Sequence, residues 1–255
     1  MKWLAACICL VLPALAAADP ALDKILECMR ANIPPTVRIQ TVEVAAYDRT
    51  GGERTLKGRL FGIKEDGKAR IMLNIDTPVD LAGASYLVRE STPSDEMYLF
   101  LPSVNRVRRI TGAAIDGQLW GTDLSYNDFK QIQNAFSGAD VTREPDTKIG
   151  DRPAYVVSFK PSKADGSRFD RIRAQVDQKT CVALTVEFFD PAGVRKTVTV
   201  DPKNVQQSGP RWFASEIDVK DPKNLTHTHV KVTGVVAADK LASRYFNPQT
   251  FYLGN

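Results

Sequence analysis

Histidine is scarce in this sequence, and the motifs of common hydrolases and nucleotide-binding enzymes are missing. The 255 residues include two histidines and no G-x-S-x-G, H-E-x-x-H or phosphate-loop pattern. The acidic residues are scattered, so no pair of them marks a general acid and a general base. We therefore predict that the chain is not an enzyme and that it has no cofactor and no resident metal.

The two histidines, His227 and His229, lie in the motif THTHV. On a strand, residues i and i+2 point to the same face, so the pair could hold a metal. Zinc requires a third or fourth ligand, and none lies nearby in the sequence. We favour the alternative, in which both are polar side chains on a solvated strand face.

Neither sign of charge dominates. The chain has 34 lysines and arginines against 30 acidic residues, a formal net charge of +4. Nucleic-acid binding requires basic residues clustered on one face, and this weak excess does not indicate it. We expect no nucleic-acid partner, and we expect a monomer.

Long apolar runs are absent after residue 18. The first twenty residues, MKWLAACICLVLPALAAADP, carry one cation at Lys2 and then an uncharged run that ends in three alanines. This run is short for a membrane span, and its small residues fit a signal-peptidase site. We expect residues 1–18 to be a signal peptide cleaved near Ala18, and residues 19–255 to form a single domain. A retained N-terminal anchor is the alternative.

Cysteine is sparse, with four residues in all, and two of them fall within the expected signal peptide. Cys28 and Cys181 remain, and an exported chain reaches an oxidising compartment where they can pair in only one way. We predict a Cys28–Cys181 disulfide, with two buried free thiols as the alternative. A catalytic thiol is disfavoured because no histidine lies nearby in the sequence to activate it.

Alternation of apolar and polar residues with period two is abundant. Roughly eleven such segments occur, with turn signals such as Asp66-Gly67 about every 8–12 residues. This spacing predicts a mainly β fold built as an antiparallel meander. Helices are few, and we expect them in residues 19–32, from Ser125 onward, and in the C-terminal segment DKLASRYF.

Several of the expected strands are apolar on both faces. In the segment YLFLP, Tyr98 and Phe100 point one way and Leu99 and Leu101 point the other. A sheet with one wet face would alternate throughout. We therefore expect part of the sheet to be covered on both sides, either by helices alone or by helices on one side and a ligand on the other.

Positive charge gathers in the run NRVRRI, which contains Arg106, Arg108 and Arg109. Alternation puts the first two arginines on one face, most often a solvated one, and the third on the other face. Arg109 is therefore out of phase. Either it turns inward and pairs with a carboxylate, or a bulge lets Ile110 take the buried side. The nearest acids in the sequence are Asp116 and Asp123.

A glycine-rich segment with Trp120 follows this run. A tryptophan is most often core filler, but three nearby glycines indicate a mobile loop, and a tryptophan on such a loop often caps a pocket. Both interpretations stay open.

Together, MYLFLPSVNRVRRI and GQLWGTDLSYNDF resemble the LolA-like outer membrane lipoprotein-sorting protein family of bacterial periplasmic proteins. Members typically show a Y-L-P-x-x-x-R-V-R-R-I hairpin and then a G-S-F-M-G-S/T-D-F-S-Y-E-D-like segment. The matching residues here are Leu101, Pro102, Arg106, Val107, Arg108, Arg109, Ile110, Gly117, Gly121, Thr122, Asp123, Ser125, Tyr126 and Asp128.

The resemblance implies a half-open antiparallel β-barrel in the periplasm, with helices covering an apolar cavity. It implies a carrier for a lipid or lipid-modified protein, and an RND-type inner-membrane transporter as a partner. The cavity or lid residues would be Trp120, Phe129, Phe61, Met72, Leu87, Tyr98 and Phe100. The residues that latch the lid, or contact a headgroup or partner, would be Arg106, Arg108, Arg109 and Asp123.

The same fold also serves envelope sensors that bind a membrane regulatory protein. In that alternative the arginine surface would be a protein-docking site, and the apolar cavity would carry no cargo.

Overall fold

The computed structural model describes residues 20–91, 94–126, 128, 140–161, 167–238 and 243–253. The expected signal peptide, Phe129 and most of the helix expected from Ser125 onward lie outside these residues. Within them the chain has one α-helix, α1 (Pro20–Ala31), and fifteen strands. The predicted mainly β class is therefore confirmed. No helix in this part of the chain is long and apolar enough to span a membrane.

The strands fall in three stretches of the chain. The first contains β1 (Val37–Tyr47), β2 (Glu53–Glu65), β3 (Lys68–Thr77), β4 (Ser85–Arg89), β5 (Glu96–Leu101) and β6 (Arg106–Ile110). The second contains β7 (Val141–Ile149), β8 (Arg152–Phe159), β9 (Arg171–Asp177), β10 (Ala183–Asp190) and β11 (Gly193–Thr199). The third contains β12 (Val205–Ser208), β13 (Arg211–Ala214), β14 (Glu216–Asp221) and β15 (Thr226–Ala238).

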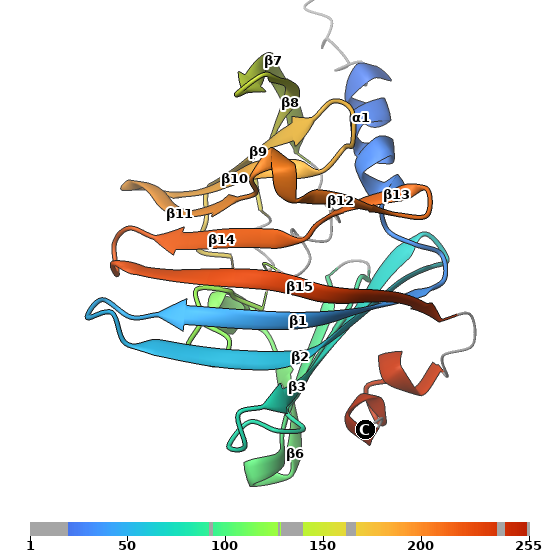
Figure 1. Cartoon of the computed structure of the whole chain (residues 1–255), viewed down its shortest axis with the longest axis vertical. Coiled ribbons are helices and arrows are strands. Elements are labelled where there is room, and N and C mark those ends of the chain that lie inside the picture. Colours follow the sequence, from blue (N-terminus) through green and yellow to red (C-terminus); the bar gives the residue numbers. More distant parts are fainter. Residues whose placement is uncertain are drawn as a thin grey trace, which may run out of the picture.

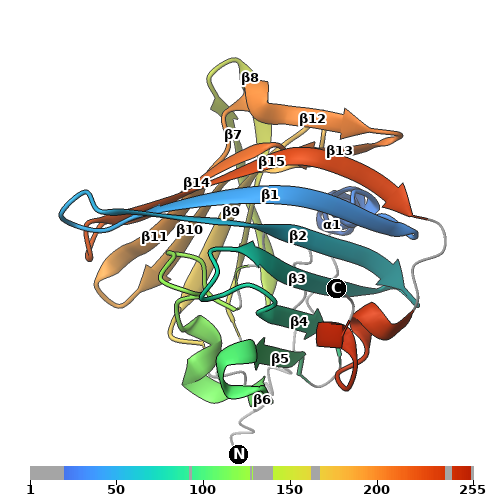
Figure 2. The same ribbon diagram turned by 60° about the horizontal axis from the view of Figure 1, so that its bottom comes forward.

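Thirteen strands form one antiparallel sheet in the order β6-β5-β4-β3-β2-β1-β15-β14-β11-β10-β9-β8-β7. Two meanders therefore meet at the β1–β15 pair, and β6 and β7 are the two edges. The sheet curves strongly but does not close, as Figures 1 and 2 show. This is the predicted half-open barrel. The remaining pair, β12 and β13, forms a separate hairpin.

The inner face of the sheet, which carries Val42, Leu60 and Leu73, holds the larger core. Helix α1 packs into this core through its apolar stripe, with Ile25 and Met29 almost fully buried. In Figure 2, α1 lies behind β1 and β2. The sheet thus has a covered inner face, and α1 covers one end of it.

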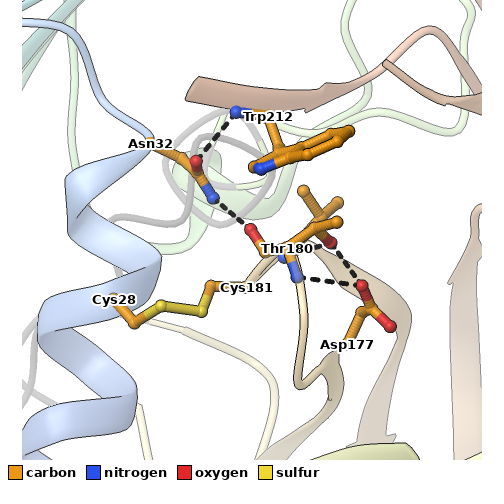
Figure 3. The surroundings of a disulfide bond; sticks show 7 residues. Cys28, Asn32, Asp177, Thr180, Cys181 and Trp212 are labelled. Carbon is orange, nitrogen blue, oxygen red and sulfur yellow. Dashed lines mark hydrogen bonds between the residues drawn. A yellow bond between two sulfur atoms is a disulfide. The ribbon is translucent and has the colours of Figure 1, made fainter. Parts of the chain in front are cut away.

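A disulfide joins Cys28 of α1 to Cys181 in the turn before β10, as predicted (Figure 3). Asn32, just after α1, reinforces this junction. Its amide donates to the Thr180 carbonyl at 2.9 Å and accepts from the Trp212 N–H at 2.9 Å. One side chain therefore ties the end of α1 to both the β9–β10 turn and the β12–β13 hairpin.

The outer face carries a second apolar cluster beneath the C-terminal segment. Two short 3-10 helices, η5 (Ser243–Phe246) and η6 (Phe251–Leu253), lie against β2 to β5. The Tyr245 ring stacks on Phe61 at 5.0 Å between centroids, and Tyr252 stacks on Phe100 at 4.2 Å. Both faces of this part of the sheet are covered, which explains strands that are apolar on both sides.

Strand β7 has no alternating apolar pattern and was not expected from the sequence. It reads VTREPDTKI, lies at a sheet edge, and its register shifts between Glu144 and Thr147, around Pro145. Charged residues, proline and a bulge are features that protect an edge strand from pairing with another chain. The same features remove the apolar alternation, so such a strand is difficult to predict from the sequence.

Candidate functional site

The inner face encloses a cavity of about 1060 Å³, counted with its opening to solvent. Seven strands of the main sheet, the β12–β13 hairpin and the loop before Asp128 form its walls. All but three of its lining residues are apolar. The lining residues are Asn32, Arg38, Gln40, Val42, Val44, Leu60, Leu73, Leu124, Val182, Ala183, Val186, Phe188, Val198, Val200, Trp212, Phe213, Ala214, Ile217, Val230 and Val232.

The polar lining residues lie together in the fold. Asn32 follows α1, and Arg38 and Gln40 are the first two inner-face residues of β1. Arg38 donates to the Asn32 carbonyl at 3.5 Å and lies 5.9 Å from the centre of the Phe213 ring. Burial, together with the nearby charge of Arg211, lowers the pKa of Arg38 to about 10. Arg38 remains protonated at neutral pH.

A second, smaller cavity of about 300 Å³ adjoins the first. It lies over β1 to β3, and Leu119, Trp120 and Leu124 contribute to its walls. Leu124 lines both cavities. Trp120 is half-buried, and its indole N–H has no hydrogen-bond partner in the described part of the chain. Trp120 and the following Gly121 both have positive φ, at 49° and 81°, so they form a tight turn over the sheet.

The loop that carries Trp120 crosses from one sheet edge towards the other and is fixed to the inner face. Asp123 accepts from the hydroxyls of Thr226 and Thr228 on β15, and the Asp123 N–H donates to Thr228 at 2.8 Å. The Tyr86 hydroxyl of β4 donates to the Tyr126 carbonyl at 2.6 Å. The loop therefore contacts both meanders of the sheet.

Arg109 is not the partner of Asp123. Strand β6 pairs with β5 without a register shift, so no bulge is present, and Ile110 takes the inner, buried side. Arg106 and Arg108 share that inner side but are exposed because β6 is an edge strand. Arg109 lies opposite Tyr98 on the outer side and is also exposed.

A buried ion pair joins the loop to β11. The Lys196 ammonium donates to the Asp128 carboxylate, and both side chains are almost fully buried, at 3% and 0% exposed. Asp128 also accepts from the Ser125 N–H at 2.6 Å, and the separation of three residues is that of a capping box. The ammonium lies 4.6 Å from the centre of the Phe188 ring. The sequence does indicate that Lys196 is buried, because this residue alternates with the inward-facing Val198 and Val200.

Asp116 is a third acid in the same loop. Its carboxylate accepts from the Arg168 N–H at 2.7 Å, and its other oxygen is buried without a partner among the described residues. Burial is the main cause that raises the pKa of Asp116, and the charge of Asp128 adds to the effect. Asp116 therefore connects the loop to the segment before β9 at an electrostatic cost.

Five of the predicted cavity residues lie on the other face of the sheet. They pack in the outer cluster under the C-terminal segment and do not line either inner cavity. Leu60, which precedes Phe61, and Leu73, which follows Met72, face the larger cavity instead. The five residues are Phe61, Met72, Leu87, Tyr98 and Phe100. Of the two predicted lid residues, Trp120 lies in the wall of the smaller cavity, and Phe129 lies outside the described residues.

The two histidines do lie on one strand face, but they have separate partners. His227 stacks on Tyr47 at 4.4 Å, and His229 Nδ1 lies 2.9 Å from Asp218 Oδ1. No group of three or more metal-ligating side chains occurs in residues that the structure describes.

Comparison with solved structures defines the class of fold. The chain superposes with a TM-score of 0.78 on a domain described as an outer membrane lipoprotein-sorting protein from Vibrio parahaemolyticus, at 21% identity, covering 90% of this chain and 97% of that one. A LolA superfamily protein from Nitrosomonas europaea gives 0.64 at 16% identity, with 88% and 96% covered. The fold is therefore LolA-like.

A DUF1329 family protein from Desulfovibrio piger gives a TM-score of 0.80 at 18% identity, covering 90% of this chain and 98% of that chain. The family model with the description "uncharacterized protein" matches residues 67–252, which is more than half of the chain. The chain belongs to that family. No curated protein shows significant sequence similarity to it. The disulfide is consistent with an oxidising compartment such as the periplasm.

Proposed function

We propose that the chain is a periplasmic carrier that binds a lipid or a lipid-modified protein in its inner cavity and moves it between envelope partners. The observation that carries this proposal is the lining of the inner cavity, in which all but three residues are apolar. Such a surface suits an acyl chain, because ligand pockets are lined predominantly by apolar side chains. Each buried CH₂ stabilises the complex by about 0.8 kcal/mol, which is enough to hold a lipid without chemistry.

A carrier must also release its cargo. The loop over the cavity reaches the sheet through polar contacts at Asp123 and Asp128, and the segment before β9 through Asp116, in addition to its buried leucines. A segment held in this way can open without unfolding the sheet, because local opening follows the least stable contacts. In this proposal the loop is the gate of the cavity, and the chain acts without catalysis.

The exposed arginines of edge strand β6 provide a surface for partners. Arg106, Arg108 and Arg109 all lie in the five-residue strand β6, and all three are exposed. Such a cluster attracts anionic membrane headgroups or an acidic surface of a partner protein, and an RND-type inner-membrane transporter is the partner that we propose. The carrier function is supported by the fold, which this chain shares over nine-tenths of its length with a lipoprotein-sorting protein domain.

Lipid analysis of protein purified from its native host tests the proposal. Native mass spectrometry should show a lipid adduct that organic extraction releases, and added lipid should displace a fluorescent fatty-acid probe. Repeated preparations that are lipid-free, combined with no probe binding, would contradict the carrier function.

A further inference from the structure

We infer that one end of the inner cavity, lined by Arg38 and Gln40, binds the anionic group of an amphipathic ligand, a carboxylate or a phosphate, while the apolar tail lies along the rest of the cavity. This inference rests on the proposed carrier function and names the chemical class of its cargo.

The first observation is a change of polarity along a single strand. Arg38, Gln40, Val42 and Val44 occupy the inner face of β1 in succession, and all four line the cavity. At about 3.3 Å per residue, the polar end and the apolar end of this row are separated by roughly 20 Å. A ligand with one polar end and one apolar tail matches this row, whereas a wholly apolar ligand would leave the polar end unused.

The second observation is the amide of Gln40. The residue is 4% exposed and lines the cavity, and no hydrogen bond in the described part of the chain uses its amide. The amide donor and acceptor are therefore available at the cavity wall, where a bound oxygen-rich headgroup is placed to use them.

The third observation is the positive charge at the same end. Arg38 lines the cavity, is only 9% exposed, and donates to the Asn32 carbonyl. Arg211, on the β12–β13 hairpin, does not line the cavity, but its charge acts on Arg38. An anion that contacts the Arg38 guanidinium is favoured by both charges.

Guanidinium geometry favours particular anions. Its planar fork of N–H donors matches the paired oxygens of carboxylate and phosphate groups. The two candidate sources are therefore a free fatty acid and a phosphate-bearing lipid headgroup. The apolar remainder of the cavity supplies the affinity in either case, and the arginine end supplies the orientation and the selectivity.

A set of ligands that differ only in their headgroup tests this inference. Dodecanoate, dodecyl phosphate and dodecanol are titrated against the complete mature protein loaded with N-phenylnaphthylamine, a neutral fluorescent probe. We expect both anions to bind at least about tenfold tighter than the alcohol, since only the anions form charge-assisted hydrogen bonds with the guanidinium group. A stronger preference for dodecanoate indicates a fatty acid, and a stronger preference for dodecyl phosphate indicates a phospholipid.

Three variants locate the effect. Arg38→Met keeps the apolar stem and should abolish the preference for anions while dodecanol affinity is unchanged. Arg211→Met should reduce the preference and serves as a second test if Arg38→Met does not fold, which its thermal midpoint reports. Arg49→Met removes the same charge from an exposed turn and should keep the wild-type preference.

The outcomes separate the two proposals. If the wild-type protein binds dodecanol and the anions equally, or if Arg38→Met and Arg211→Met both keep the full preference for anions, the headgroup site is contradicted and the carrier function stands. If no ligand binds to any folded variant or to the wild type, the carrier function fails, and the headgroup site fails with it.

Discussion

Asp123 and Thr228 are joined by two hydrogen bonds across 105 residues of sequence. The Asp123 N–H donates to the Thr228 hydroxyl at 2.8 Å, and that hydroxyl donates to the Asp123 carboxylate at 2.9 Å. Thr228 is fully buried. This contact attaches the loop over the cavity to β15, at the centre of the sheet.

Replacing Thr228 with valine should loosen the loop. The isosteric side chain leaves the Asp123 N–H buried without a partner, which costs about 1–3 kcal/mol. We expect a lower denaturation midpoint and faster hydrogen exchange in residues 117–126, with the exchange of β8 to β10 unchanged. Thr233→Val on the exposed part of β15 is the control. Unchanged exchange in the loop would show that this contact does not hold it.

The buried pair Lys196–Asp128 predicts a strongly coupled double-mutant cycle. Lys196→Met leaves the Asp128 carboxylate buried and uncompensated, and we expect a loss of about 3–5 kcal/mol of unfolding free energy. The double variant Lys196→Met/Asp128→Asn should recover most of this loss, since the neutral amide oxygen still accepts from the Ser125 N–H. Additive effects in urea denaturation would argue against a direct interaction between the two side chains.

Asp116 predicts a pH-dependent effect on stability. Its pKa is raised in the folded state, so the folded chain takes up this proton more readily than the unfolded chain. The group therefore lowers stability above its raised pKa, and this cost disappears as pH falls towards the ordinary pKa of aspartate. Asp116→Asn should increase the unfolding free energy at pH 7, and the increase should shrink as the pH is lowered through this window.

A matched control for that experiment is Asp151→Asn, which removes one negative charge from an exposed turn. A gain for Asp116→Asn that is independent of pH would contradict the electrostatic explanation, as would a loss of stability at pH 7.

The disulfide between Cys28 and Cys181 should contribute substantially to stability. It spans 153 residues, and in the chain-entropy model a loop of that length stabilises the fold by about 5 kcal/mol. We expect a reductant to lower the denaturation midpoint of the wild-type protein and to leave the double variant Cys28→Ser/Cys181→Ser unaffected. Equal midpoints with and without reductant in the wild type would show that the cross-link adds nothing.

The fold class could be predicted because it depends on a local pattern, and the disulfide could be predicted because only one pairing is possible. Alternation identifies antiparallel strands, and two cysteines in an exported chain can form only one bond. Strand β7 escaped prediction since an edge strand rich in charge, with Pro145 at its bulge, lacks that alternation.

The side of the sheet that faces the cavity could not be predicted. Phe61 and Leu60 are both apolar, and a shift of one residue exchanges the faces of a strand. Only the curvature of the whole sheet and the position of the C-terminal segment decide which side is concave. Arg109 is similar: alternation put it on the face opposite Arg106 and Arg108, but which of these faces is the inner one follows from the curvature of the sheet, and its exposure follows from β6 being an edge strand.

Lys196 could have been found from alternation alone. It occupies an inner-face position in line with Val198 and Val200, so a buried charge was implied. Its partner, Asp128, is 68 residues away, and no local pattern indicates that separation. Pairing over such distances follows from the topology of the sheet.

Ligand binding by two valine variants of β15 tests the central claim, that the inner cavity holds apolar cargo. Val232 lines the cavity, whereas Val236, four residues further along the same strand, is 63% exposed. We predict that Val232→Phe lowers the affinity for a fluorescent fatty-acid probe by at least about tenfold, because the ring occupies space that the acyl chain requires. Val236→Phe should bind as the wild type does. Equal affinities for both folded variants would contradict the claim.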